Sequence, residues 1–252
     1  TGVLGTSGRR VRAVTPGLFF GRDVDQNGML TAAGENDFAG SVDSEDLGWA
    51  ENLTVDSAVQ NVDAAGETRV NLQSADENAL AAIPGITPQI AHAIVTYRGQ
   101  HRFQSIADLL DVTPPQNQNG GGTVVDENLF MNIADQVTTE TGQSLPGAIN
   151  LNTAGLDVLA CLPGMTRELA QAVISQRQSA GFFANIGELL KVPGMTRDLF
   201  KQLAPLVTAR SETFRILSEG RVNSTGARQR IQAIVRIGLN DPKTLSWRED
   251  DL

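Results

Sequence analysis

Cysteines, aromatic residues and long apolar runs are all scarce in this sequence of 252 residues. The single cysteine, Cys161, excludes an internal disulfide. No run of about 18 apolar residues occurs, so we expect no membrane-spanning helix in these residues. Aromatic residues make up only 5% of the chain, so its cores must be built mainly from leucine, isoleucine, valine and alanine. The length still allows one substantial core or several smaller ones.

Positive charge is also scarce, and it is spread unevenly. The net charge is −9 at pH 7. Residues 1–69 hold five basic and eleven acidic residues, and residues 114–148 hold no basic residue at all. Only residues 149–210, with six basic and four acidic residues, and the tail from 211 carry a slight positive excess. Because a nucleic-acid interface needs a basic face, this balance makes nucleic acid an unlikely partner.

A block of sequence occurs twice. The segment from Val70 to Thr87 returns at Ile149 to Thr166, and Pro84-Gly85 becomes Pro163-Gly164 at an offset of 79 residues. Proline stops a helix and glycine supplies the turn, so each copy predicts a helix, a tight hairpin and a second helix. We expect Ser74 and Thr153 to cap the first helix of each copy, and Thr87 and Thr166 to cap the second. A further helix is expected at residues 126–134.

The turn in each copy resembles the hairpin of the helix-hairpin-helix family, which reads Pro-Gly-hydrophobic-Gly and holds a DNA phosphate on backbone N–H groups. Here threonine replaces the second glycine in three hairpins, the third lying at 192–196. A threonine disfavours positive φ and close phosphate approach, so we interpret the hairpins as protein-contact surfaces. A DNA-binding protein of the DNA-uptake type is the alternative. The candidate contact residues are Pro84, Gly85, Thr87, Pro163, Gly164, Thr166, Pro193, Gly194 and Thr196.

Alternation of apolar and polar residues begins at Thr213. It runs to Ile237, interrupted by turn residues at 223–226, and predicts an antiparallel hairpin with one buried face. A short third strand is expected at 244–248. We therefore predict an α+β fold in which residues 1–69 and 211–252 form one discontinuous sheet domain. An all-α domain is inserted into it, made of a first helical block at 70–148 and a second at 149–210.

Several segments resemble the K family of minor pseudopilins of the type II secretion system, namely 149–154, 162–166, 218–222 and 245–249. The resemblance implies a pilin-like antiparallel sheet domain with the helical insertion. It also implies a non-enzymatic subunit that caps the tip of the secretion pseudopilus at the periplasmic face of the inner membrane. Its partners would be the I and J minor pseudopilins and secreted exoproteins. The N-terminal hydrophobic helix of that family is missing, so we expect a processed or truncated piece of a longer protein.

An acidic loop has the spacing of a calcium-binding loop. Oxygen ligands fall at Asp23, Asp25 and Asn27, a backbone carbonyl at Met29, and glycine at the sixth position. Glutamate is one residue late, at Glu35, and Asp37 is a further candidate ligand. The sequence predicts a structural Ca²⁺ site, with a solvated turn as the alternative. No catalytic motif stands out, so we expect no enzyme activity.

Overall fold

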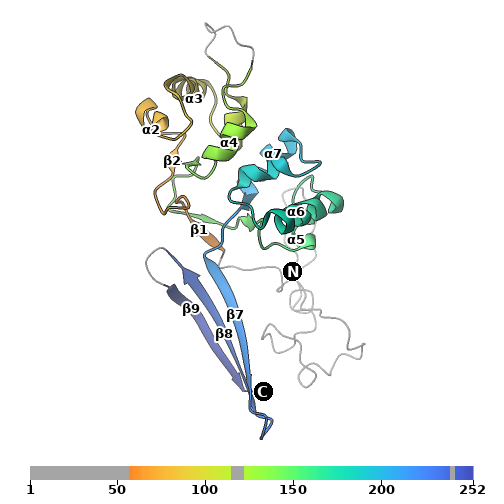
Figure 1. Cartoon of the computed structure of the whole chain (residues 1–252). Helices are drawn as coiled ribbons and strands as arrows, with labels where there is room; N and C mark the ends of the chain where they lie inside the picture. The colour runs from red at the N-terminus through yellow and green to blue at the C-terminus, as the bar shows by residue number, and fades with distance from the viewer. Residues whose placement is uncertain (1–56, 115–121, 239–241, 252) are drawn as a thin grey trace, which may run out of the picture. The chain divides into compact units, whose positions relative to one another are not determined.

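The computed structural model describes residues 57–114, 122–238 and 242–251 (Figure 1). These residues all belong to one compact unit, residues 56–252. Within them, no helix has both the length and the apolar character needed to cross a membrane.

The first repeat comprises residues 70–138 and is built mainly of short helices. Its second helix, α3, is the longest, and it starts where Thr87 caps it and Pro88 suits the first helical position. In chain order its elements are β2 (Val70–Asn71), α2 (Glu77–Ala81), α3 (Pro88–Gln100), η2 (Ile106–Asp111), α4 (Glu127–Ile133) and β3 (Val137–Thr138).

The second repeat comprises residues 149–208 and follows the same order. Parallel pairing of its two terminal strands closes it, as the pairing of β2 with β3 closes the first repeat. Its elements are β5 (Ile149–Asn150), α5 (Leu156–Ala160), α6 (Arg167–Ala180), η3 (Ile186–Lys191), α7 (Arg197–Leu203), η4 (Ala204–Leu206) and β6 (Val207–Thr208).

The duplication is longer than the sequence comparison indicated. The helix predicted at 126–134 is confirmed as α4, with Asp126 as its N-cap and Ala134 as its C-cap. It corresponds to α7 of the second repeat, since Leu129-Phe130 matches Leu199-Phe200 at an offset of 70 residues. Residues 126–138 therefore belong to the first repeat. The change of offset, caused by a longer loop before α4, hid this match.

The two repeats pack against each other reciprocally. Helix α4 contacts η3, and its counterpart α7 contacts η2, as expected for an approximate two-fold relation. Phe130 and Phe200, which are equivalent residues, meet edge to face with ring centroids 5.5 Å apart. Both rings are fully buried in a single apolar core that continues through both repeats. The repeats therefore form one folding unit.

Matching arginines stabilise the start of each repeat. The Arg98 guanidinium donates to the carbonyls of Leu72 and Ala75 at 3.0 and 2.8 Å. Arg177 donates to the carbonyls of Leu151 and Ala154 at 2.9 and 2.8 Å. These carbonyls lie in the turn before the first helix. The expected caps of that helix are wrong, because Asp76 caps α2 and Gly155, which has no side chain, occupies the N-cap of α5.

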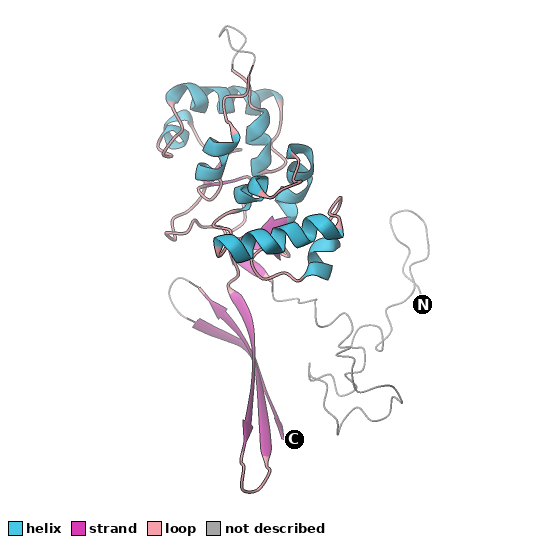
Figure 2. Ribbon diagram, turned by 45° about the vertical axis from the view of Figure 1, so that its right-hand side comes forward, coloured by secondary structure: helices cyan, strands magenta, loops and turns pink. Residues whose placement is uncertain are grey.

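A three-stranded antiparallel sheet forms the C-terminal part (Figure 2). The predicted strands are confirmed, and the third is longer than expected. The expected buried face is wrong for the described side chains, because Phe214, Ile216 and Trp247 are 41%, 50% and 57% exposed and only Ala233 is buried. The strands are β7 (Thr213–Arg221), β8 (Arg228–Ile237) and β9 (Pro242–Asp251).

A pilin-like domain assembled from both chain ends is not shown. The described residues before the first repeat contain β1 (Ala58–Gln60), which pairs with β4 (Ser144–Pro146) between the repeats. One hydrogen bond, from the Gln60 N–H to the Glu212 carboxylate at 2.8 Å, joins this segment to the start of the C-terminal sheet. The structure is a mixture of helices and sheet, which agrees with the α+β prediction at that level.

Candidate nucleic-acid interface

Three tight hairpins have the same backbone. The glycines Gly85, Gly164 and Gly194 have φ of 96°, 72° and 89°, a conformation that strongly favours glycine. In each hairpin the residue after this glycine donates its N–H to the carbonyl three residues before it, as Met165 does to Leu162 at 3.1 Å. The Pro-Gly pairs therefore produce the predicted turns.

The threonine after each hairpin has negative φ. Thr87, Thr166 and Thr196 have φ of −79°, −82° and −95°, and each hydroxyl accepts a hydrogen bond from the N–H three residues later, at 3.2–3.3 Å. They are helix N-caps, as predicted for Thr87 and Thr166. Threonine therefore suits the backbone at this position, contrary to the prediction from φ. Positive φ is needed only at the first glycine, so threonine leaves the hairpin backbone intact.

The hairpin at 163–167, in the second repeat, offers donors for an anion. Within the described residues, the N–H groups of Gly164, Thr166 and Arg167 donate no hydrogen bond. They lie at the N-terminus of the 14-residue helix α6, where the helix dipole favours negative charge. The Arg167 side chain is 64% exposed and pairs at 2.9 Å with Asp157, whose side chain is 78% exposed. This hairpin combines backbone donors with an accessible guanidinium.

A carboxylate lies beside these donors. Glu168 is fully exposed, and hydrogen bonds from its own backbone N–H and from the Thr166 hydroxyl lower the pKa of its side chain. The Glu168 carboxylate is therefore an internal anion at the start of α6, and its negative charge opposes the approach of a phosphate to the hairpin.

The equivalent hairpin of the first repeat is poorer in donors. Pro88 stands where the second repeat has Arg167, so both a side-chain cation and a backbone N–H are missing. Gln89 replaces Glu168. The first repeat also has no second Pro-Gly hairpin, because the loop before α4 replaces it.

The third hairpin, at 193–196, is involved in the contact between repeats. The following Arg197 donates to the Leu110 carbonyl of the first repeat, and Lys201 pairs with Asp111. The hydrogen bond to Asp111 is the main reason that the pKa of Lys201 is raised. Helix α7 has only seven residues. We therefore assign these two cations to the packing of the repeats.

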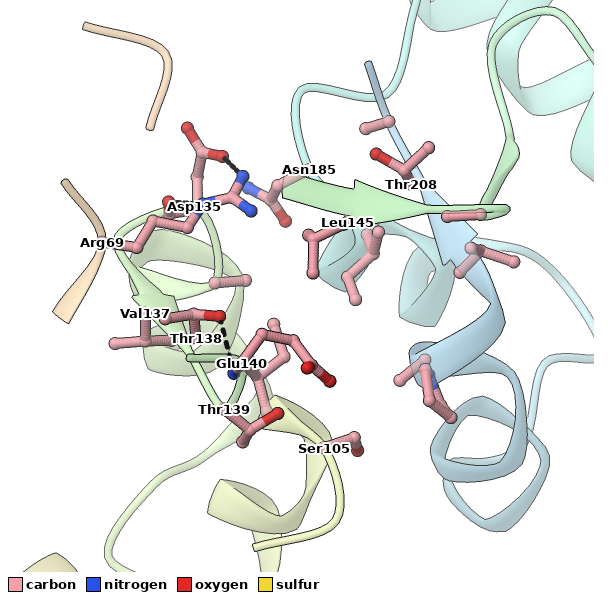
Figure 3. A pocket seen from close by; sticks show the side chains of 18 of the residues that line it. Arg69, Ser105, Asp135, Val137, Thr138, Thr139, Glu140, Leu145, Asn185 and Thr208 are labelled. Carbon is pink, nitrogen blue, oxygen red and sulfur yellow. Dashed lines mark hydrogen bonds and ion pairs between the residues drawn. The ribbon is translucent and has the colours of Figure 1, made fainter. Parts of the chain in front are cut away.

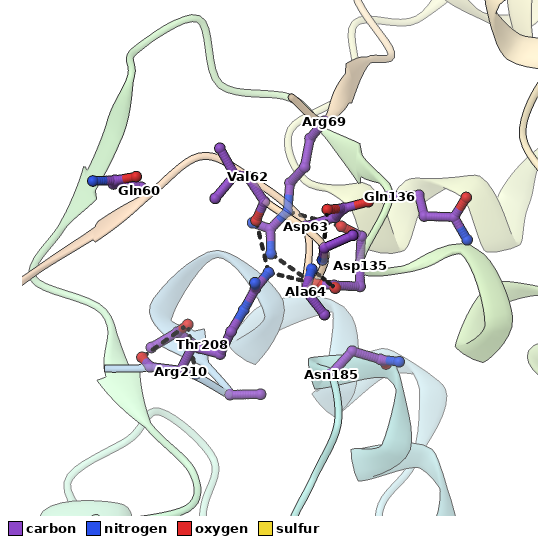
Figure 4. Close-up of polar contacts among 12 residues, drawn as sticks. Gln60, Val62, Asp63, Ala64, Arg69, Asp135, Gln136, Asn185, Thr208 and Arg210 are labelled. Atoms are coloured by element: carbon purple, nitrogen blue, oxygen red, sulfur yellow. Dashed lines mark hydrogen bonds and ion pairs between the residues drawn. The ribbon is translucent and has the colours of Figure 1, made fainter. Parts of the chain in front are cut away.

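A network around Asp135 also joins the repeats (Figure 4). Its carboxylate accepts from the Ala64 N–H at 2.8 Å, from Arg69 at 2.7 Å and from Arg210, which also donates to the Val62 carbonyl at 2.7 Å. Burial is the main reason that the pKa of Arg210 is lowered. The network connects the segment before the first repeat to the end of the second.

A cavity of about 240 Å³ lies between the repeats (Figure 3). Equivalent residues line it from both sides, including Val137 with Val207 and Thr138 with Thr208. Thr138 also accepts from the Glu140 N–H at 3.1 Å. The cavity thus follows from the packing of two similar units, and none of the hairpin residues lines it.

The predicted calcium ligands lie outside the described residues, so Asp23, Asp25, Asn27, Met29, Glu35 and Asp37 stay a prediction. Among residues that the structure does describe, no group of three or more histidine, cysteine, aspartate or glutamate side chains is arranged to hold a metal ion.

Two segments of the chain match the helix-hairpin-helix motif. They are residues 66–114 and 147–208, which correspond to most of the two repeats. The sequence resemblance to this motif is therefore confirmed.

Several curated proteins are also similar to the chain. Endonuclease/exonuclease/phosphatase family domain-containing protein 1 of Xenopus laevis is 29% identical over 145 residues, covering 52% of this chain and 25% of that protein. The human protein of that name is 22% identical over 177 residues, which cover 61% of this chain and 30% of the human protein. An uncharacterized protein of Neisseria meningitidis is 28% identical over 142 residues, which cover 55% of this chain and 18% of that protein. The chain thus spans less than a third of these relatives. No solved structure matches it.

These findings overturn the resemblance to minor pseudopilin K. The relatives are named for the endonuclease/exonuclease/phosphatase family and the matched motif is helix-hairpin-helix, with no pseudopilin among the findings. The secretion role and the pseudopilin partners are therefore wrong, as is the prediction that nucleic acid is an unlikely partner. Segments 149–154 and 162–166 misled because they belong to the repeated motif itself. The periplasmic location depended on that resemblance and stays an untested prediction.

Proposed function

We propose that this chain is a nucleic-acid-binding module that contacts the phosphate backbone of duplex DNA. The hairpin at 163–167 of the second repeat carries this proposal, since it presents unpaired backbone N–H groups, a helix N-terminus and the exposed Arg167 together. Binding through backbone donors and one arginine reads no base edges. We therefore expect little dependence on DNA sequence.

The comparisons support the proposal. The match to the helix-hairpin-helix motif covers this hairpin, and the named relatives belong to an endonuclease/exonuclease/phosphatase family. The proposal concerns binding alone, and the expected absence of enzyme activity stays an untested prediction. Calcium binding by the acidic loop is a separate proposal, and a rise in melting temperature on addition of millimolar Ca²⁺ would support it.

The test is the binding of a fluorescently labelled 25-base-pair duplex, followed by anisotropy over a salt series. We expect a dissociation constant of about 1–100 μM, as is typical of non-specific binding, and an affinity that falls as salt rises. The Arg167→Gln variant should lower the salt slope by about 0.9, the amount for one lost phosphate contact. Arg102→Gln is the matched control, because Arg102 is an exposed arginine of the first repeat.

Two results would contradict the proposal. One is the absence of duplex binding by the wild-type chain at about 50 mM salt, where phosphate contacts are strong. The other is an equal loss of affinity in Arg167→Gln and Arg102→Gln, which would assign the effect to overall charge and not to the hairpin.

A further inference from the structure

The C-terminal sheet has two chemically different faces. In an antiparallel sheet, directly opposed residues lie on the same face, and alternate residues of a strand share a face. Phe214 pairs with Val235, and Ile216 pairs with Ala233, which pairs in turn with Trp247. These residues define an apolar face. The residues between them must lie on the opposite face.

The basic residues of the segment 211–252 whose side chains are described occupy that opposite face. Arg215 lies between Phe214 and Ile216 in β7, and Arg221 lies on the same face at the end of that strand. Thr213 pairs with Arg236, which pairs in turn with Lys243. Leu217 pairs with Gln232, which pairs in turn with Arg248. We call this surface the basic sheet face, and define it by Arg215, Arg221, Arg236, Lys243 and Arg248.

The basic sheet face is accessible and only partly neutralised. The side chains of Arg215, Arg221, Lys243 and Arg248 are exposed, and that of Arg236 is half-buried. Among the described side chains, the acidic residue placed on this face by the register is Glu219. A face whose described side chains include five basic residues and one acidic residue stands out in a chain of net charge −9. Charge complementarity therefore points to a polyanion.

The dimensions suit a duplex. Strand β8 has ten residues, so it extends about 34 Å at about 3.4 Å per residue, close to one turn of B-form DNA. Binding of single strands usually also requires aromatic side chains on which bases stack. The aromatic residues of this sheet, Phe214 and Trp247, lie on the other face. The face therefore offers charge without a stacking surface.

We propose that the basic sheet face is a second contact for the phosphate backbone of duplex nucleic acid, separate from the hairpin at 163–167. The choice of nucleic acid over other polyanions rests on the proposed function of the helix-hairpin-helix repeats. The face adds affinity and salt dependence, and it contributes no sequence preference.

The test compares two triple variants of the full chain. Arg215→Gln, Arg221→Gln and Lys243→Gln remove three exposed charges from the basic sheet face. Arg9→Gln, Arg10→Gln and Arg12→Gln remove the same charge near the N-terminus of the sequence. With labelled duplex DNA at about 50 mM salt, the sheet variant should bind at least about tenfold more weakly, with its salt slope lowered by up to about 2.7. Both variants should keep the wild-type circular dichroism spectrum.

The outcomes separate this proposal from the proposed function. If the sheet variant binds duplex as tightly as the control, the basic sheet face is not a contact. A loss of duplex affinity in Arg167→Gln would still support the hairpin as a contact. If the sheet variant is weakened and Arg167→Gln is not, the sheet is the interface and the hairpin proposal fails. If neither duplex DNA nor duplex RNA binds the wild-type chain, both proposals fail. Binding of phosphatidylserine vesicles that requires the sheet charges, with unchanged duplex binding, would overturn the sheet proposal in favour of a lipid surface.

Discussion

The first and second repeats share a backbone but differ in charge. Residues 70–138 hold two basic and seven acidic residues, whereas residues 149–208 hold five and four. The buried positions match closely, as with Phe130 and Phe200 or Leu129 and Leu199. The surface positions differ. Pro88 and Gln89 of the first repeat are equivalent in sequence to Arg167 and Glu168 of the second. The comparison teaches that the duplicated core maintains the fold, while the surface of one copy is suited to binding an anion.

Truncation of the two central phenylalanines should test whether the copies fold together. Phe130→Ala and Phe200→Ala should each lower the free energy of unfolding by about 3–5 kcal/mol, because each opens a cavity in the shared core. Urea unfolding followed by circular dichroism should keep one transition in both variants. Phe182→Ala is the control. It should change the free energy of unfolding by less than about 0.5 kcal/mol, because Phe182 is 65% exposed. Two separate transitions would show that the repeats are independent units.

The paired arginines should contribute equally to stability. Arg98→Gln and Arg177→Gln should each lower the free energy of unfolding by about 2–3 kcal/mol, because two carbonyls lose a charged donor. The same unfolding experiment measures this, with Arg102→Gln as the exposed control. A large effect at only one of the two positions would mean that the turns are not equivalent.

The first glycine of each hairpin should separate stability from binding. Gly85→Ala and Gly164→Ala should each lower the free energy of unfolding by about 1–3 kcal/mol because of positive φ. The added Cβ would also come within 2.8 Å of Leu129 and 2.7 Å of Leu199, respectively. Only Gly164→Ala should also weaken duplex binding. Gly99→Ala, inside α3 with nothing near its Cβ, should be neutral or stabilising. Equal loss of binding in both hairpin variants would place the first repeat in the interface too.

Exchange of the residue after the hairpin should have the smallest effect. Glu168→Gln should raise duplex affinity several-fold, because it removes a negative charge beside the hairpin donors. Gln89→Glu in the first repeat should change affinity little. Since the pKa of Glu168 is lowered, its carboxylate stays ionised at neutral pH. The difference between wild type and Glu168→Gln should therefore narrow only as the pH falls through that lowered pKa. Anisotropy titrations at several pH values measure this, and unchanged affinity in Glu168→Gln would exclude competition by the carboxylate.

Local patterns predicted the backbone of the hairpins well. The Pro-Gly pairs placed all three hairpins, and Thr87 and Thr166 cap the helices that follow, because turns and caps depend on a few neighbouring residues. The consequence drawn from threonine failed. It assumed that positive φ is needed at the second glycine position, whereas the capping conformation there has negative φ. The donors at Gly164 to Arg167 could have been inferred from this cap.

Charge totals were a weaker guide than charge positions. The net charge of −9 argued against nucleic acid, and it concealed the basic sheet face. The arginines at 228, 230 and 236 alternate visibly in the sequence, but their alignment with Arg215 and Lys243 depends on the strand register. Register is set by pairing between strands, so composition cannot supply it.

The sequence by itself determined the duplication, the hairpins and the C-terminal strands, because periodicity and turn chemistry act over a few residues. Only the tertiary structure assigned α4 to the first repeat, brought Phe130 against Phe200, and gathered the basic residues on one face of the sheet. Each of these depends on contacts between residues far apart in the chain, which packing and strand register select together.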